Sequence, residues 1–216
     1  MEPTLLLIIV VILILSVIIH EISHGYAALY LGDPTARLAG RLTLNPLPHI
    51  DPLGTIIIPA ILVLSSAGFV IGWAKPVPYN PYNLRNQRWG EAMVAGAGPL
   101  VNIGIALIFG LLIRFGDVLS IVSIGFYEVA SLIVFINILL AIFNLIPVPP
   151  LDGSKVLHAL LPYHLALRYE ALGEFMARYG LITTFAFIFI FIFFLWPLFF
   201  HFVSAVFSLI TGTTLF

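Results

Sequence analysis

The sequence predicts an all-α polytopic membrane protein. Of its 216 residues, 61% are hydrophobic and only 9% are charged, whereas an ordinary globular chain carries about 25% charged residues. Several apolar runs are long enough to cross a bilayer as helices, and prolines and polar loops separate them. We therefore expect one membrane-embedded domain over residues 1–216, built as a bundle of about 4–6 transmembrane helices.

The apolar runs place the expected spans. They cover residues 4–31, 92–113, 124–146 and 181–209. The first run lacks the basic start of a signal peptide, so we interpret it as a retained span. Pro197 divides the last run, which is therefore either one long kinked helix or a tight pair of helices.

Two further segments predict structure at the membrane surface. Residues 35–50 alternate apolar and polar side chains, a pattern typical of a short membrane-associated β segment. The apolar run at 53–73 is broken by Pro59 and by the small residues at 65–68. If this run is a re-entrant hairpin, eight of the nine lysines and arginines share one face and only Arg114 lies opposite. If it crosses fully, the split is six against three.

Because cytoplasmic loops carry the excess of lysine and arginine, the eight-to-one division favours the re-entrant hairpin. Two classes of function are disfavoured by composition. A net charge of −1 argues against nucleic-acid binding, and the absence of cysteine excludes disulfides, thiolate metal ligands and a cysteine nucleophile.

The most informative polar residues lie inside the first span, which reads His20-Glu21-Ile22-Ser23-His24 near its end. A spacing of four residues puts the two imidazoles on one helix face, one turn apart, where they can share a metal ion. Glu21 is placed to act as the base for an attacking water. Ionisable groups are costly in hydrocarbon and usually serve a function there, so this motif predicts a catalytic metal site.

Two histidines do not complete such a site, because catalytic zinc normally takes three protein ligands. Asp152 is the strongest candidate for the third, because it follows an apolar helix in a proline-rich segment and precedes flexible Gly153. A metal would also supply the charge that an Asp needs in a low-dielectric setting. The other candidates near membrane depth are His49, Asp51, Asp117, Glu128 and His201.

Some polar and small residues admit two interpretations. His49 and Asp51 either orient a metal-bound imidazole or belong to a solvated turn in which Asp51 caps the next segment, and the sequence favours neither. Asn102 is more typical of an interhelical hydrogen bond than of catalysis. Close helix packing is the expected role of Gly96, Gly98 and Gly104.

Three stretches together resemble the site-2 protease family of intramembrane zinc metalloproteases, peptidase family M50. They are residues 20–25 (HEISHG), 96–102 (GAGPLVN) and 144–153 (NLIPVPPLDG). The resemblance covers roughly residues 5–160, which it implies are the catalytic core, with C-terminal accessory helices over 161–216. It implies one Zn²⁺ per chain held by His20, His24 and Asp152, Glu21 as catalytic acid and base, and Asn144 as a holder of the substrate or oxyanion.

We expect a compact form of this family, without PDZ or CBS domains. The resemblance implies hydrolysis of peptide bonds in transmembrane-helix substrates, as in regulated intramembrane proteolysis. The partners would be single-span membrane proteins and the lipid bilayer. The expected location is a prokaryotic inner membrane, with several spans and the active site toward the cytoplasm. An extended substrate is expected to pair with an edge strand at 35–45.

Two other functions use the same His/His/Asp site: a membrane metal-ion carrier and a non-catalytic pseudoprotease. Glu21 favours the protease, because a carrier needs no base beside its first ligand, and no inverted repeat is apparent. The sequence leaves open the substrate, the oligomeric state, including a homo-oligomer, and any adaptor.

Overall fold

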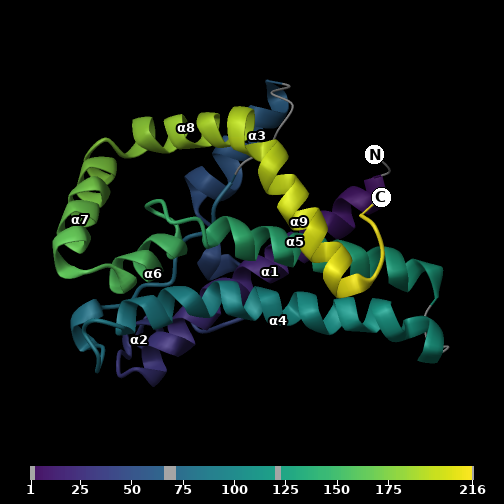
Figure 1. The fold of residues 1–216 in the computed structure, drawn as a ribbon, viewed down its shortest axis with the longest axis horizontal. Helices are drawn as coiled ribbons and strands as arrows, with labels where there is room; N and C mark the ends of the chain where they lie inside the picture. Colours follow the sequence, from purple (N-terminus) through teal and green to yellow (C-terminus); the bar gives the residue numbers. More distant parts are fainter. Residues whose placement is uncertain (1–2, 66–71, 120–122, 216) are drawn as a thin grey trace.

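The protein is helical, as the sequence predicts. A computed structural model describes residues 3–65, 72–119 and 123–215, and contains no β-strand in these ranges. Four described helical runs are long and apolar enough to cross a membrane. They are α1 (Pro3–Tyr30), α4 (Gly90–Leu119), α5 (Ile124–Asn144) and the run Ile182–Thr211 (Figure 1). The prediction of an all-α integral membrane protein is confirmed.

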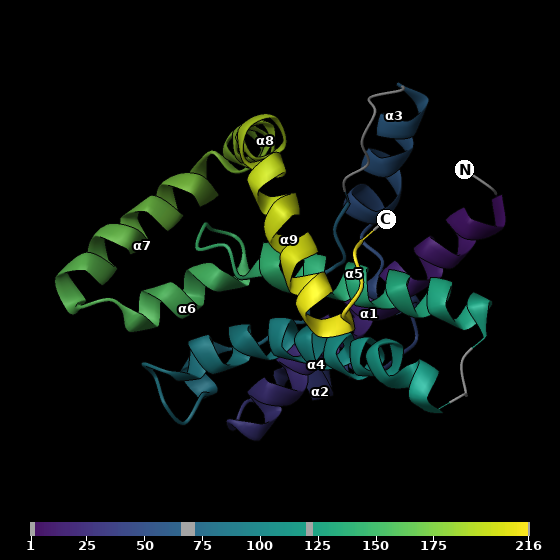
Figure 2. The same ribbon diagram turned by 45° about the vertical axis from the view of Figure 1, so that its right-hand side comes forward.

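Helix α4 is the centre of the bundle. It packs against α1, α5, the short helix α6 (Asp152–Leu160) and α9 (Trp196–Thr211). Figures 1 and 2 both show α4 running alongside α1 and α5. The buried core between these helices combines small residues with large ones, as in Ala106 and Ala130 against Phe207. Small residues let the backbones approach closely where lipid offers no hydrophobic driving force.

The last apolar block is one bent helical run. Helix α8 (Gly180–Ile190) continues through a π-helical turn, Phe191–Leu195, into α9. Figure 1 shows the bend between α8 and α9. Pro197, at the start of α9, has no backbone N–H to donate, and π turns and prolines are the usual causes of such bends. Of the two predicted alternatives, the kinked helix is the one found.

The β segment predicted at 35–50 is not found. The chain instead forms helix α2 (Thr35–Leu38), turns and a 3₁₀ turn at Leu47–His49. Asp33 accepts hydrogen bonds from the backbone N–H and the hydroxyl of Thr35, at 3.2 and 2.6 Å, and such local bonds favour a turn over an extended strand. Gly40 then reverses the chain with a φ of 65°. The edge strand expected at 35–45 is therefore absent.

In the described parts of the apolar run at 53–73, a helix stands away from the bundle and the two ends lie together. The run begins as a π-helical turn, Pro52–Ile57, and continues as α3 (Ile58–Leu64), which Figure 2 shows standing away from α1, α4 and α5. Residues 66–71 lie outside the described part of the chain. The two ends of the run are hydrogen-bonded: Trp73 N donates to Gly54 O at 3.1 Å, and the Thr55 hydroxyl donates to Trp73 O at 2.8 Å.

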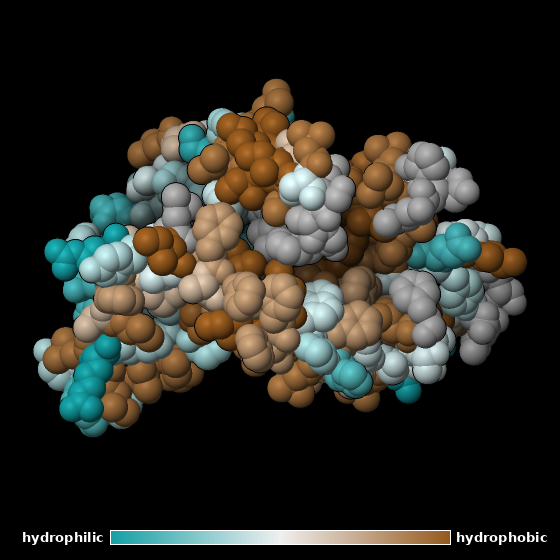
Figure 3. All heavy atoms as spheres, turned by 90° about the horizontal axis from the view of Figure 1, so that it is seen from above, coloured by the Kyte–Doolittle hydropathy of each residue, from teal (hydrophilic) through white to brown (hydrophobic). Residues whose placement is uncertain are grey.

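The surface of the molecule is largely apolar. Figure 3 shows brown, hydrophobic residues over most of the upper face, with hydrophilic residues gathered most strongly at the left end. Helix α7 (Tyr163–Arg178) lies at the left in Figure 1. It is anchored to the proline-rich loop by the Tyr169 hydroxyl, which donates to Pro147 O at 2.9 Å. This distribution of apolar and polar residues is the one expected of a protein whose main part lies in lipid and whose polar end lies in water.

Not all of the glycines that were predicted to allow close helix packing have that role. A Cβ at Gly96 or Gly104 would meet no heavy atom within 4 Å, so neither glycine is needed for space. Gly98 faces the predicted metal ligands instead of another helix backbone. The glycine that brings two spans together is Gly110, where a Cβ would collide with Ile210 of α9.

The substitution Gly110→Ala is expected to lower the thermal unfolding midpoint in detergent. Overpacking a tight contact costs about 1–3 kcal/mol. Gly104→Ala, on the same helix, is the matched control, and it should keep or slightly raise the midpoint because Ala favours a helix interior by about 0.5–1 kcal/mol. Equal midpoints for the two variants would contradict the α4–α9 contact.

Candidate metal centre

The three predicted ligands meet at one point. His20 and His24 lie one turn apart on α1, with their ring centroids 4.6 Å apart. Asp152, the first residue of α6, places its Oδ2 3.1 Å from His20 Nε2 and 3.2 Å from His24 Nε2. One ligand atom from each residue lies within 4.8 Å of the others, and both histidines are buried. The group could hold one metal ion.

The turn after α5 aims Asp152 at the histidines. Residues 145–151 fold into successive turns, and α6 begins at Asp152. A Cβ at Gly153 would collide with Leu145 O, so glycine allows the chain to close this turn. The turn directs Oδ2 of Asp152 at the Nε2 atoms of both histidines.

The hydrogen bonds of the histidines leave both Nε2 atoms available to a cation. His24 Nδ1 lies 2.7 Å from Val94 O, which can only accept, so Nδ1 carries the proton. His20 Nδ1 lies 2.6 Å from Asn102 Oδ1 and must likewise donate. In a neutral imidazole the other nitrogen then has a free lone pair. Two nitrogens and one carboxylate oxygen are a donor set that fits zinc with an open fourth position.

A buried polar chain supports His20 from behind. Asn102 Nδ2 donates to Asn137 Oδ1 at 2.7 Å, which fixes Oδ1 of Asn102 as the atom facing His20. Asn137 Nδ2 in turn donates to the Ser16 hydroxyl at 3.0 Å. This chain joins α4, α5 and α1, so Asn102 is the interhelical contact that we predicted and also orients a candidate ligand. Asn137 was missed, although an amide inside an apolar span was a visible signal.

Helix α4 presses directly on the imidazoles at Gly98. A Cβ there would stand 2.5 Å from His24 Nε2 and 2.6 Å from His20 Nε2. Real side-chain atoms do not approach so closely, so any other residue would push both rings away from Asp152. The space for the metal centre therefore depends on the absence of a side chain at this position.

Two other predicted residues lie on neighbouring elements. Glu21, next to His20 on α1, accepts a hydrogen bond at Oε2 from Val77 N at 2.9 Å. Asn144 is the last residue of α5, and its Nδ2 donates to Leu140 O at 2.9 Å. That bond uses one of the two amide hydrogens of Asn144.

The remaining candidates are held within their own segments. Asp51 accepts a hydrogen bond from Gly54 N at 2.7 Å, which is the capping role that the sequence allowed. His49 is buried, and its Nε2 lies 3.0 Å from Thr43 O. His201 is exposed on α9, with Nδ1 2.7 Å from Pro197 O. Glu128 lies in α5, and the side chain of Asp117 falls outside the described structure.

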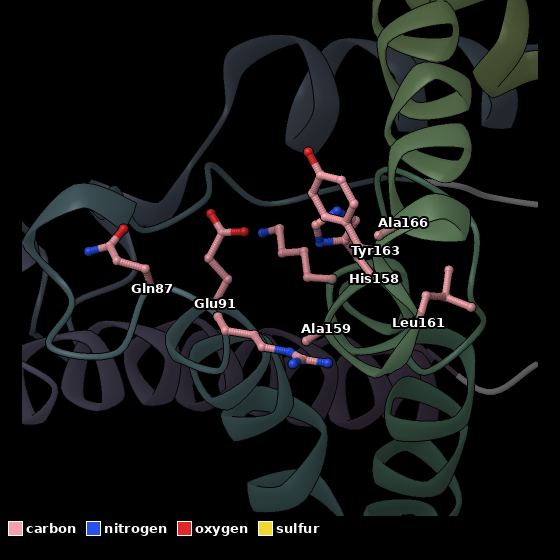
Figure 4. A pocket seen from close by; sticks show the side chains of 9 residues that line it. Gln87, Glu91, His158, Ala159, Leu161, Tyr163 and Ala166 are labelled. Carbon is pink, nitrogen blue, oxygen red and sulfur yellow. The ribbon is translucent and has the colours of Figure 1, made fainter.

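A pocket of about 260 Å³ opens beside the start of α4. Figure 4 shows Gln87 and Glu91 on one side of it and His158 and Tyr163 on the other. Its lining includes none of the three candidate ligands, but it includes Lys155, one turn after Asp152 on α6. The Lys155 ammonium stands 5.2 Å from the centre of the Tyr79 ring. The pocket is thus a neighbour of the metal centre at the polar end of the bundle.

Replacing Gly98 by Ala is expected to weaken zinc binding by at least about tenfold, because the added Cβ displaces both imidazoles. The matched control is Gly96→Ala, where the Cβ meets nothing within 4 Å. Competition with a chromogenic chelator measures both affinities, and thermal unfolding checks that both variants fold. Equal zinc affinity in the two variants would show that the imidazoles do not depend on this contact.

Asn102→Leu keeps the number and branching of the side-chain heavy atoms but removes the acceptor of His20 Nδ1–H. We expect zinc affinity to fall by about 10–100-fold, the usual loss when a group that orients a ligand is removed. Asn144→Leu, whose amide is bonded to its own helix, should retain zinc and serves as the control. Unchanged zinc affinity in Asn102→Leu would rule out the orienting role.

Comparison with known proteins agrees with this centre. The model of peptidase family M50 matches residues 113–191. The "Putative zinc metalloprotease YwhC" of Bacillus subtilis is 42% identical over 158 residues, which are 71% of this chain and 68% of that protein. The "Putative zinc metalloprotease Rip2" of Mycolicibacterium smegmatis is 30% identical over 67% of this chain and 53% of its own length.

A more distant relative, "Zinc metalloprotease MJ0392" of Methanocaldococcus jannaschii, is 26% identical over 70% of this chain and 33% of its own length. No solved structure matches the chain. The chain therefore spans about two thirds of the Bacillus relative and about half of the mycobacterial one. With this similarity and a His/His/Asp group that could hold one zinc ion, the chain belongs to the site-2 protease family of zinc metalloproteases, peptidase family M50.

Proposed function

We propose that this metalloprotease cleaves peptide bonds of transmembrane helices within or near the bilayer. One observation carries the proposal: a three-residue metal-binding group, with a glutamate beside it, lies on a helix long and apolar enough to span the membrane. A substrate that reaches this group must itself enter the membrane. Single-span membrane proteins are the class of substrate that fits.

The roles of the residues follow from their chemistry. His20, His24 and Asp152 would hold one Zn²⁺, which when bound supplies Lewis-acid activation of water and of the peptide carbonyl. Glu21 takes the proton of the attacking water and passes it to the leaving amine nitrogen. Asn144 donates its second amide hydrogen to the developing oxyanion. The last two roles rest on the family's motifs, on the place of Glu21 beside His20 and on the place of Asn144 at the end of α5.

The orientation that we propose puts the metal centre toward the cytoplasm. The end of α1 and the segment before α4 lie together, because Arg85 N donates to Leu31 O at 2.9 Å. The loops at this end carry most of the basic residues, whereas Arg114 donates to Leu209 O near the C-terminal end of α9. An excess of lysine and arginine on one side supports a cytoplasmic face, and a prokaryotic cell (inner) membrane is the proposed location.

We also propose that residues 53–73 form a re-entrant hairpin. The hydrogen bonds between Gly54, Thr55 and Trp73 support it, since a run whose two ends touch returns to the side that it left. Residues 5–160 would then form the catalytic core, and residues 161–216 would add accessory helices around it. The bent run of α8 and α9 is the main element of that second part.

The substitution Glu21→Gln separates a protease from the other functions. The purified variant should keep its zinc, because none of the three proposed ligands changes. Cleavage of a panel of single-span substrates should fall by at least about 100-fold, because a general base contributes roughly 10²–10⁴-fold to the rate. Asp152→Ala should lose both zinc and cleavage.

Two results would overturn the proposal. Undiminished cleavage in Glu21→Gln would remove Glu21 as the base. Zinc uptake by proteoliposomes that survives Glu21→Gln, without cleavage by the wild type, would favour the metal-ion carrier.

A further inference from the structure

An extended segment lies directly on the catalytic part of α1. Residues 72–80 follow the hairpin without helix or strand, and we call residues 75–80 the strap. Val77, in its middle, is only 6% exposed. A Cβ at Gly25, the residue after His24, would stand 2.9 Å from Val77 Cγ1. The absence of a side chain at Gly25 thus lets the strap sit against the helix.

Buried charged groups hold the strap near both ends. Arg41, 8% exposed, donates from Nη2 to Lys75 O at 2.8 Å and to Pro76 O at 3.3 Å. Asp33, fully buried, accepts from Asn80 N at 2.7 Å. Hydrogen bonds in which one partner is charged are shorter and stronger than neutral ones. The strap is therefore fixed in place relative to α1 and α2.

Asp33 is suited to hold the strap because its carboxyl group stays ionised. Burial opposes its ionisation, but hydrogen bonds from Thr35, Asn83 and Asn80 outweigh that and keep the pKa of its carboxyl below the usual range. The same carboxylate binds Asn83 Nδ2 at 2.8 Å, just beyond the strap. One anion thus fastens both the strap and the segment that follows it.

Residues 75–78 of the strap have no spare backbone donor with which to pair a substrate. Pro76 and Pro78 have no N–H, Lys75 N donates to His49 O, and Val77 N donates to Glu21. Over residues 75–78 every backbone N–H is therefore either missing or used. Added strands need free donors on the edge that they join. Residues 75–78 therefore do not offer such an edge, and the N–H of Val77 goes to Glu21.

We propose that the backbone N–H of Val77 positions the catalytic carboxylate. This inference rests on the proposed function, in which Glu21 is the base. The N–H holds Oε2 of Glu21 and leaves Oε1 free to take the proton of the attacking water. A glutamate has several rotatable bonds, and a reacting group held in place avoids the cost of finding its geometry in each cycle. Val77 is a positioning residue and does not touch substrate.

The substitution Val77→Pro deletes this N–H and keeps an extended backbone, as its neighbours Pro76 and Pro78 do. We expect kcat on a single-span substrate to fall by about 10–100-fold, the loss typical of a misplaced catalytic group. KM and zinc content should stay near wild-type values, because neither the substrate path nor the ligands change. Val77→Ala keeps the N–H and loses only side-chain contact, so its loss of kcat should be much smaller.

Two additional variants make the test independent of folding. Asp33→Asn weakens the distant anchor without touching Val77, so it should lower kcat in the same direction while zinc is retained. In a Glu21→Gln background, Val77→Pro should cause no further loss of the residual rate, because the group that it positions is gone. If the role of Val77 were purely structural, the losses of cleavage rate in Val77→Pro and Glu21→Gln would add in the double variant. Val77→Pro would then also alter the unfolding midpoint or the zinc content.

The outcomes separate this inference from the proposed function. Equal losses in Val77→Pro and Val77→Ala would assign the effect to packing and overturn the positioning role. A higher kcat in Val77→Pro would mean that the strap restrains Glu21 as an inhibitory latch, which also overturns it. Full activity in Val77→Pro with an inactive Glu21→Gln would refute only the positioning. Full activity in Glu21→Gln would refute the proposed function itself.

Discussion

The contact of Asp152 with His20 and His24 is the interaction on which the arrangement of α1, α4 and α6 depends. A carboxylate and two imidazoles buried in an apolar bundle are unfavourable unless they are paired. Nδ1 of His24 donates to Val94 O and Nδ1 of His20 donates to Asn102, and the Nε2 atoms of both rings face Asp152 Oδ2, where one cation would pair with all three groups. To bring them together, the chain must fix α1, α4 and the turn before α6 relative to one another.

Helix α4 contributes to this centre along one stripe. Val94, Gly98 and Asn102 are spaced by four residues and so lie on one face of the helix. The first supplies a carbonyl to His24, the second leaves room for both rings, and the third holds His20. A single helix face thus sets the tautomer and the position of both imidazoles. Gly98 and Asn102 also belong to the 96–102 stretch that resembles the family.

The segments between α1 and α4 organise the other side of the site. Asp33 and Arg41 hold the strap, the strap holds Glu21, and the hydrogen bond between Trp73 N and Gly54 O lies just before the strap. The β segment predicted at 35–50 was wrong. The prediction followed from the alternation of apolar and polar side chains there, which is typical of a strand. Local hydrogen bonds from Thr35 to Asp33 favoured a turn and a short helix there.

The sequence by itself determined the membrane class, the four long helices and the residue types of the metal centre, because hydropathy and the spacing of His20 and His24 are local properties. Tertiary structure decided what those residues face. Only the packing of α4 against α1, α5 and α9 revealed the chain from His20 through Asn102 to Asn137. Of the three glycines predicted to allow close packing, it left the need at Gly98 alone and added Gly110. These contacts join residues far apart in the chain, and no local pattern encodes which pairs meet.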